Sequence, residues 1–202
     1  MMTITYAAGS AIYVNMTNRC PCACVFCIRH NKDRVFDSDS LWLDREPTVK
    51  EVCDSIDTWD MTEYDEIVFC GYGEPTERLY DLLEVARHIR SKSKINIRIN
   101  TNGLADLIWN ESTAPKLEGL IDTVSISLNA TDKDAYFKVV HPKFGIDSYD
   151  SMLKFTKDCT RYVPSVVMTV VDIVTSKEEQ EHCRKICESV GATLRIRPYV
   201  SD

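Results

Sequence analysis

Four cysteines lie within residues 20–27, directly after an apolar segment. Thiolates are soft ligands that favour iron and zinc, and a short loop can direct several of them at one centre. A closed zinc site usually takes a second Cys or His pair a dozen or more residues later, and none follows here. Cys20, Cys24 and Cys27 instead have the spacing C-x-x-x-C-x-Φ-C, and Phe26 supplies its aromatic residue. A cubane iron–sulfur cluster takes four ligands, so three cysteines would leave one iron open to an outside molecule.

The fourth thiol, Cys22, lies between the first two ligands of this pattern. Two interpretations remain open. In the first, Cys22 is a bystander and the other three thiolates hold a cluster. In the second, all four thiolates close a metal site in which no iron is open, and the chain is a non-enzymatic metal or electron-transfer module.

A second group of candidate residues follows an expected strand at 66–70, in the run Gly71-Tyr72-Gly73-Glu74. Two glycines let the backbone approach a ligand closely, and the Glu74 carboxylate suits an ammonium group. The same run would also serve as an ordinary turn between a strand and a helix.

Polar side chains also end the next two expected strands. Asn100 and Asn102 close the strand at 95–100, where their amides can fix a ligand by hydrogen bonds. In the strand at 123–128, period two sends Ser125, Ser127 and Asn129 to one face. A polar stripe is unusual in a buried parallel strand, because buried hydroxyls need partners. A bound carboxylate and ribose would supply those partners, and so would neighbouring backbone.

Other strand ends carry weaker candidates. Cys70 closes the strand beside the glycine run, and it is either a hydrogen-atom donor or a packed core thiol. Asp172 and Arg197 end the fifth and last strands, where they would contact a substrate or form a structural salt link. Cys183 and Cys187, four residues apart on one helix, read as two buried thiols because no further ligand lies nearby.

The elements that position these residues alternate between β-rich and helical segments, the pattern of a parallel sheet. Expected strands span 4–6 and 11–16, which pair as an N-terminal hairpin, and then 66–70, 95–100, 123–128, 165–171 and 193–197. Expected helices span 48–59, 76–89, 114–118, 132–140, 148–159 and 177–190, and a long loop covers 34–46. We expect one compact α/β domain over residues 1–202, a partial (β/α)6 TIM-like barrel with fewer units than the eight of a closed barrel. The active site of such a fold collects at the carboxyl ends of the strands.

Composition limits the function further. The 202 residues are 44% hydrophobic, which suits one domain with a sizeable core. A net charge of −7 argues against a broad nucleic-acid surface. Nine unevenly spaced cysteines without a signal peptide indicate a reducing compartment, and no apolar run approaches the ~18 residues of a membrane span, so we expect a cytoplasmic protein. The basic residues behind the cysteine loop form either a solvated loop or an anionic-substrate contact; they are Arg29, His30, Lys32 and Arg34.

The cysteine spacing resembles the cluster loop of the radical S-adenosylmethionine (SAM) superfamily. The resemblance implies a [4Fe-4S] cluster on Cys20, Cys24 and Cys27, whose open iron chelates the amino and carboxylate groups of SAM. One electron from the reduced cluster then yields methionine and a 5′-deoxyadenosyl radical, which abstracts hydrogen from an unidentified small-molecule substrate. The run at Gly71 resembles the superfamily's Gly-Gly-Glu motif, with Tyr72 as a departure. The cofactor contacts that the resemblance implies are Phe26, Gly71, Gly73, Glu74, Asn100, Ser125 and Ser127. Asn102, Asn129, Asp172 and Arg197 are left as substrate candidates.

A narrower resemblance covers nearly the whole chain, through residues 12–21, 41–43, 68–76, 100–105 and 124–130. Together these segments are similar to the small TatD-associated radical SAM proteins. This implies a minimal barrel without an auxiliary-cluster domain, a flavodoxin or ferredoxin as electron donor, and a TatD-type hydrolase as a possible partner. An alternative with the same chemistry is a protein substrate, as in activases that act on a partner's glycine. The loop at 33–46 would cover a small molecule.

Overall fold

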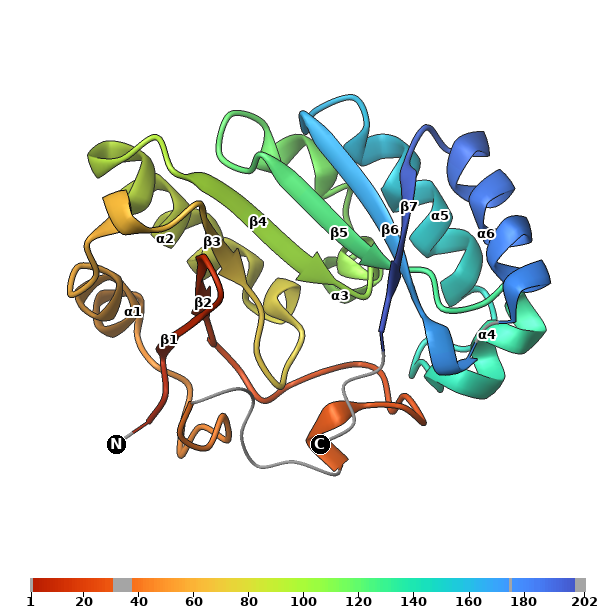
Figure 1. Ribbon diagram of the computed structural model, residues 1–202, viewed down its shortest axis with the longest axis horizontal. Helices are drawn as coiled ribbons and strands as arrows, with labels where there is room; N and C mark the ends of the chain where they lie inside the picture. The colour runs from red at the N-terminus through yellow and green to blue at the C-terminus, as the bar shows by residue number, and fades with distance from the viewer. Residues whose placement is uncertain (1, 31–37, 175, 199–202) are drawn as a thin grey trace.

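The computed structural model describes residues 2–30, 38–174 and 176–198 (Figure 1). Within them, seven strands form one sheet in chain order. The strands are β1 (Thr5–Ala8), β2 (Ala11–Val14), β3 (Glu66–Phe69), β4 (Asn96–Thr101), β5 (Thr123–Ser127), β6 (Ser165–Val171) and β7 (Thr193–Arg197). β1 is antiparallel to β2, and every other neighbouring pair is parallel. The expected hairpin and the parallel sheet are therefore confirmed.

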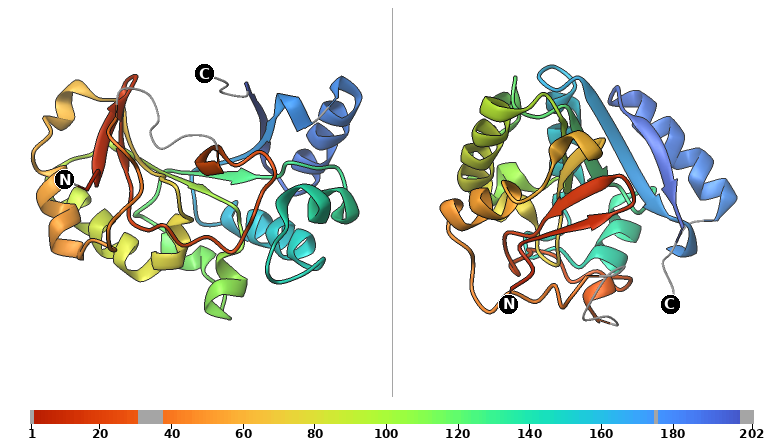
Figure 2. Two further views of the ribbon diagram at one scale, coloured as in Figure 1. Left: turned by 90° about the horizontal axis from the view of Figure 1, so that it is seen from below. Right: turned by 60° about the vertical axis from the view of Figure 1, so that its left-hand side comes forward.

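Six α-helices of the described residues connect these strands. They are α1 (Val49–Ile56), α2 (Leu79–Lys92), α3 (Ala105–Trp109), α4 (Lys133–Val140), α5 (Ser148–Cys159) and α6 (Lys177–Ser189). The sheet curves into an open trough with the helices along its outer side, and β1 and β7 are its two free edges (Figure 2). This is the expected partial barrel, and it does not close.

The core fills the space between the sheet and the helices. Along the strands, alternate residues such as Ile67, Ile97 and Val124 are fully buried on the helix side. Helix α2 contributes Leu82 and Ile89 to the same cluster. The face of the sheet that the helices cover is uniformly apolar. The concave face carries the polar side chains, because successive residues of a strand point to opposite faces.

Local hydrogen bonds explain where the helices begin. Thr48 and Glu51 form a reciprocal capping box that starts α1. Helix α2 begins at Leu79, three residues later than expected, because a 3₁₀ turn, η3 (Pro75–Arg78), precedes it. The expectation at 76–89 was thus wrong at its start, since Pro75 fixes the entry geometry but the first turn is tighter than an α-helix.

Two further features differ from or lie beyond the sequence expectations. Helix α3 was not expected, because five residues are too few to show a helical period. The loop expected at 34–46 and the cover expected at 33–46 begin outside the described residues, and residues 38–43 form no helix or strand. No helix in the described part of the chain is long and apolar enough to cross a membrane.

Candidate metal and cofactor site

The cysteine loop follows β2 and crosses below the carboxyl ends of the strands (Figure 1). Its backbone is fixed to the end of α4. The Ala23 amide donates to the Val140 carbonyl at 3.1 Å, and the Lys143 amide donates to the Pro21 carbonyl at 2.8 Å. The loop is therefore anchored to a distant part of the chain rather than held only by its own turns.

The three expected cluster ligands, Cys20, Cys24 and Cys27, are half-buried and free of disulfides. The Cys27 amide donates to the Cys24 carbonyl at 3.1 Å, which turns the loop back on itself. A hydrogen bond with the Cys22 thiol lowers the pKa of Cys20, while burial raises the pKa of Cys27. Thiols become metal ligands only when deprotonated, so the protein favours the ligand form of Cys20, whereas Cys27 depends on the bound cation to lose its proton.

The cysteine thiols are the donor type that an iron–sulfur cluster takes. Among the described residues, no three Cys, His, Asp or Glu side chains converge closely enough to hold one metal ion. A cubane instead spreads its thiolate ligands over different irons. Three free thiols on one loop match the number of protein ligands that such a cluster takes when one iron stays open.

Cys22 lies inside this loop and differs from its neighbours. It is only 5% exposed and packs into the main hydrophobic core. Its backbone forms an isolated antiparallel bridge with Pro142. The side-chain amide of Asn102 lies 3.7 Å from the Cys22 sulfur and 4.0 Å from the Cys20 sulfur. Asn102, expected as a substrate contact, therefore lies against the cysteine loop.

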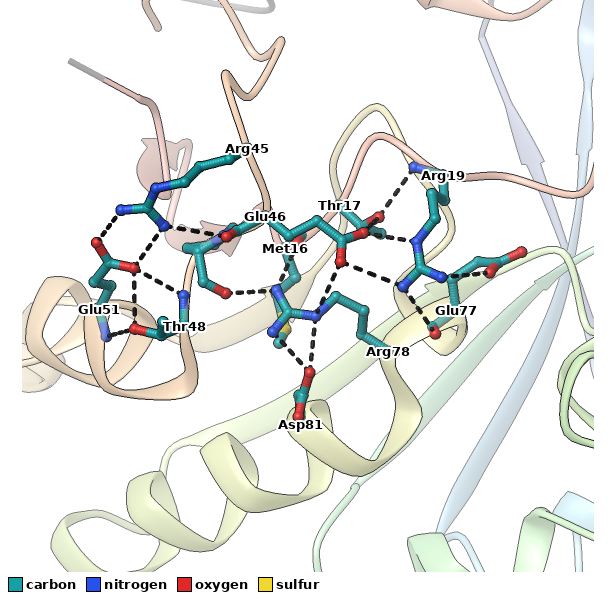
Figure 3. A network of polar contacts seen from close by, with 11 residues as sticks. Met16, Thr17, Arg19, Arg45, Glu46, Thr48, Glu51, Glu77, Arg78 and Asp81 are labelled. Atoms are coloured by element: carbon teal, nitrogen blue, oxygen red, sulfur yellow. Dashed lines mark hydrogen bonds and ion pairs between the residues drawn. The ribbon is translucent and has the colours of Figure 1, made fainter.

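Figure 3 shows how the segment entering the cysteine loop is held. The Arg78 side chain is only 8% exposed, and its Nη1 donates to the carbonyls of Met16 (2.9 Å) and Pro47 (2.6 Å). Its Nε donates to Asp81 at 2.8 Å. One guanidinium thus ties the end of β2, the start of α1 and the first turn of α2 together.

Glu46 completes this network on the solvent side. It accepts hydrogen bonds from the Thr17 hydroxyl at 2.5 Å and from Arg19 Nε at 2.7 Å. Burial alone would raise the pKa of Glu46, but the hydrogen bonds from Thr17 and Arg19 outweigh it and hold the pKa below its ordinary value. The carboxylate form that grips the loop entry is therefore the stable one near neutral pH.

The glycines after β3 serve close backbone packing. A Cβ on Gly71 would lie 2.0 Å from Asn15 Oδ1, and one on Gly73 would lie 2.2 Å from the Thr17 carbonyl oxygen. The sequence interpretation, that these glycines admit a ligand, missed this reason. They allow the Gly71–Glu74 run to pack against the segment that leads into the cysteine loop.

Glu74 is buried, and four donors already occupy its carboxylate. Oε1 accepts from the Thr76 backbone amide (3.0 Å), the Thr76 hydroxyl (2.7 Å) and the Thr101 hydroxyl (2.7 Å). Oε2 accepts from the backbone amide of Asn102 (2.7 Å). Burial raises its pKa despite these bonds. Because Oε2 has a single donor, it keeps capacity for one more, such as an ammonium group.

The polar residues of β4 and β5 face the trough. Asn100 Oδ1 is buried without a hydrogen-bond partner among the described residues, and the Asn100 side chain hydrogen-bonds Cys70. Burial is the main cause of a raised pKa at Cys70. Ser125 is buried with Arg195 Nη2 3.5 Å from its hydroxyl, whereas the half-buried Ser127 hydroxyl bonds to no described residue. The structure therefore brings Cys70, Asn100 and the two serines to one face.

Two further residues near the site are notable for a buried polar atom without a partner in the described part of the chain, although neither belongs to a motif. Asn129 is buried with φ +59°, and its side-chain oxygen lacks a partner in the described structure. Tyr136 on α4 is fully buried, and its hydroxyl is likewise unpaired there, although the Cys20, Cys22 and Cys24 thiols act on it electrostatically. Sequence reasoning missed Tyr136, whose only signal was its place in an amphipathic helix.

The last two candidates end neighbouring strands. Asp172 begins the 3₁₀ turn η5 (Asp172–Val174) after β6 and is exposed. Arg197 ends β7, is half-buried, and forms no ion pair with any described residue. Burial lowers the pKa of Arg197.

The family model of the Radical SAM superfamily matches residues 14–186. The chain belongs to this superfamily. The superfamily's cofactors are a [4Fe-4S] cluster and SAM. The matched segment begins before the cysteine loop and extends into α6, so it contains the loop, the Gly71–Glu74 run and the polar ends of β4 to β6.

Solved structures share the fold at low sequence identity. SuiB of Streptococcus suis bound to S-adenosylmethionine has a TM-score of 0.70 at 16% identity, over 94% of this chain and 40% of that one. TYW1 with a lysine-pyruvate adduct has a TM-score of 0.66 at 16% identity, over 95% and 65%. A radical SAM methyltransferase from Sphaerobacter thermophilus has a TM-score of 0.64 at 17% identity, over 96% and 57%.

These structures are longer than this chain, which spans 40–65% of their lengths. At these identities the likeness extends to the fold alone. No curated protein sequence matches the chain.

Proposed function

We propose that Cys20, Cys24 and Cys27 hold a [4Fe-4S] cluster, that SAM binds its open iron, and that the enzyme abstracts hydrogen from a small molecule. When bound, the two groups supply one-electron cleavage of SAM to methionine and a 5′-deoxyadenosyl radical. The observation that carries the proposal is the set of three free thiols on a loop fixed beside strand ends whose polar atoms lack partners.

The chain's own residues have separate roles in this proposal. Asn102 directs its amide at the cysteine sulfurs, and hydrogen bonds to cluster sulfurs set the reduction potential. Glu74 Oε2 takes the ammonium group of SAM, and Ser127 takes its carboxylate. Ser125 and Asn100 face the same space, while Phe26, beside the last ligand, excludes water from the loop.

A small molecule is the favoured substrate because the unpaired polar atoms lie on side chains of the trough itself, where a compact polar ligand would contact several of them. The single electron comes from a flavodoxin or a ferredoxin in this proposal. A protein substrate would have to place a flexible segment into the same trough.

The test begins with anaerobic reconstitution, reduction with dithionite and addition of SAM. We expect methionine and 5′-deoxyadenosine, detected by chromatography, with SAM binding measured in parallel. An intact cluster with bound SAM that yields neither product, with or without candidate substrates, would contradict the proposal.

Four alanine variants identify the ligands. Cys20→Ala, Cys24→Ala and Cys27→Ala should each lose most of the bound iron and sulfide, since a cubane with two protein ligands is poorly held. Cys22→Ala is the matched control and should keep both. Loss of iron in Cys22→Ala as well would indicate a four-thiolate site with no open iron.

A further inference from the structure

Strand alternation brings an unusual set of charges onto the concave face of the sheet. Register pairs Val68 with Arg98, Ser125 with Val167 and Thr169 with Arg195, so these residues share that face. Among the described strand residues directed there, three are arginines and one is an acid. They are Arg98, Arg195, Arg197 and Glu66.

The single acid neutralises one arginine only. Glu66 pairs with Arg98 Nη2 at 2.7 Å. Arg98 is 9% exposed, and its Nε is nevertheless buried without a partner, as is the Nε of Arg197. Arg195 reaches one acceptor, the Ser125 hydroxyl at 3.5 Å, which is at the limit of a hydrogen bond. Two guanidinium groups therefore remain without a counter-charge within the described structure.

These three cations lie close enough to act on one another. Burial lowers the pKa of Arg195, and the charges of Arg98 and Arg197 lower it further. Burial is also the main cause of the lowered pKa of Arg197, to which Arg98 contributes. Arg195 is exposed and Arg197 is half-buried, with a buried Nε that has no partner in the described structure. A partly buried guanidinium without a partner, beside a second cation that solvent can reach, indicates a place where an anion binds.

We infer that the concave face binds a substrate carrying at least two negative charges, as carboxylates or as a phosphate, through Arg195 and Arg197. Guanidinium groups present forked donors that match the oxygens of both groups. The inference rests on the proposed function, because it names the substrate class of that same site. Arg197 ends β7, and its register partner on β6 is Val171, so the anion contacts the concave face beside the end of β6.

The carboxylate of SAM alone does not account for this charge. SAM offers one carboxylate, whereas three arginines against Glu66 leave an excess of two positive charges. If Arg195 contacts the cofactor carboxylate through its place beside Ser125, Arg197 still faces the trough without a partner among the described residues. Arg197 is therefore left for the second anionic ligand that the inference assigns to this face.

The experiment titrates citrate and inorganic phosphate into the cluster-loaded protein by calorimetry, with sodium chloride matching the ionic strength. The variants are Arg195→Gln and Arg197→Gln, which keep side-chain size, and folding is checked by thermal melts. Arg161→Gln is the control, since that side chain is 63% exposed and its partner, Asp158, lies 3.8 Å away. SAM is titrated into every protein in parallel.

We expect citrate or phosphate to bind the wild type, and its affinity to fall at least about tenfold in either test variant and to be unchanged in the control. Stronger binding of citrate identifies a polycarboxylate, and stronger binding of phosphate identifies a phosphorylated substrate. The inference is overturned if neither anion binds the wild type, or if all variants bind equally well.

Two outcomes separate this inference from the proposed function. If the test variants lose SAM affinity and the wild type binds neither anion, the arginines serve the cofactor, and the inference fails while the proposed function stands. If the wild type holds no cluster or SAM but binds an anion through these arginines, the anion site is supported and the proposed function fails.

Discussion

The entry to the cysteine loop and the concave face of the sheet both border the candidate site, but their polar atoms are used differently. Around the entry, Arg78 donates to three protein acceptors and Glu74 accepts from four donors. On the concave face, the Nε of Arg197 and the side-chain oxygen of Asn100 have no described partner. The two regions differ in degree: most polar atoms named at the entry are paired within the described structure, Asn15 Oδ1 being an exception, whereas several on the concave face are not.

This difference follows from what each region must do. Ligands to a cluster have to be held in fixed positions, so the backbone that carries them is supported by buried hydrogen bonds. A ligand-binding face instead keeps donors unpaired, and the cost of leaving them so is recovered when the ligand binds. The following variants test whether the two regions divide in this way.

Replacement of Arg78 should have the largest effect on folding. Arg78→Ala leaves the carbonyls of Met16 and Pro47 without their buried donor, and we expect the free energy of unfolding to fall by about 2–4 kcal/mol. Denaturant melts measure this, with the exposed Arg161→Ala as the control within about 0.5 kcal/mol of wild type. A loss below about 1 kcal/mol would mean that the entry is not the rigid region.

Replacement of Ser127 should affect binding rather than folding. Its hydroxyl bonds to no described residue, so Ser127→Ala should leave the unfolding free energy nearly unchanged. Loss of one hydrogen bond to a carboxylate weakens SAM binding by ~1.5–3 kcal/mol, roughly ten- to a hundredfold in affinity. SAM titration and denaturant melts decide between the two roles, with Ser165→Ala at the exposed start of β6 as control.

If Ser127→Ala destabilises the fold and leaves SAM affinity unchanged, the hydroxyl belongs to the sheet. The concave face would then be less open to ligands than its unpaired atoms indicate.

Tyr136 lies between the two regions and gives a smaller effect. Its buried hydroxyl has no partner among the described residues, so Tyr136→Phe should raise the unfolding free energy of the cluster-free chain by about 1 kcal/mol. If the proposed cluster lies against Tyr136, the cluster-loaded protein should show no such gain, because the hydroxyl would then have a partner. Equal gains in both forms would exclude Tyr136 from the site.

The smallest expected effect is on the pH dependence of stability, and it concerns Glu51 in the capping box of α1. Hydrogen bonds from Arg45 and from Thr48 lower the pKa of Glu51 to about 2. A lowered carboxyl pKa contributes stability above its unfolded value of about 4.5 and loses it as pH falls toward 2. Unfolding of the cluster-free chain should therefore show a pH slope between 5 and 2 that is shallower in Glu51→Gln; identical slopes would contradict the capping role of Glu51.

The sequence predicted the parts of this protein that depend on spacing along one segment. The cysteine pattern, the strand at Ser125 and the helix at 148–159 are read from neighbours in the chain, and the structure has that strand and helix. Alternation along each strand separates Arg98 on β4, and Arg195 on β7, from their apolar neighbours. Only the register of the whole sheet shows that the two arginines share a face.

Other features depend on contacts between distant segments, which spacing does not reveal. The spacing of Gly71 and Gly73 suggested glycines that face a ligand. In the structure, a side chain at either position would clash with Asn15 or with the Thr17 backbone, which follow β2. Tyr136 became a site residue only because α4 packs against the cysteine loop. Which strand ends and helices meet is a property of the whole fold.

The anchoring of the cysteine loop to α4 has a consequence for the order of events in folding. The bonds from Ala23 to Val140 and from Lys143 to Pro21 join segments from opposite halves of the chain, and such contacts form late because they close a long loop. On the ribosome, the thiols therefore emerge well before the helix that fixes them. Iron delivered during synthesis would meet a cysteine loop that lacks its hydrogen bonds to α4 and Lys143. We therefore expect insertion of the proposed cluster to follow the synthesis and folding of α4.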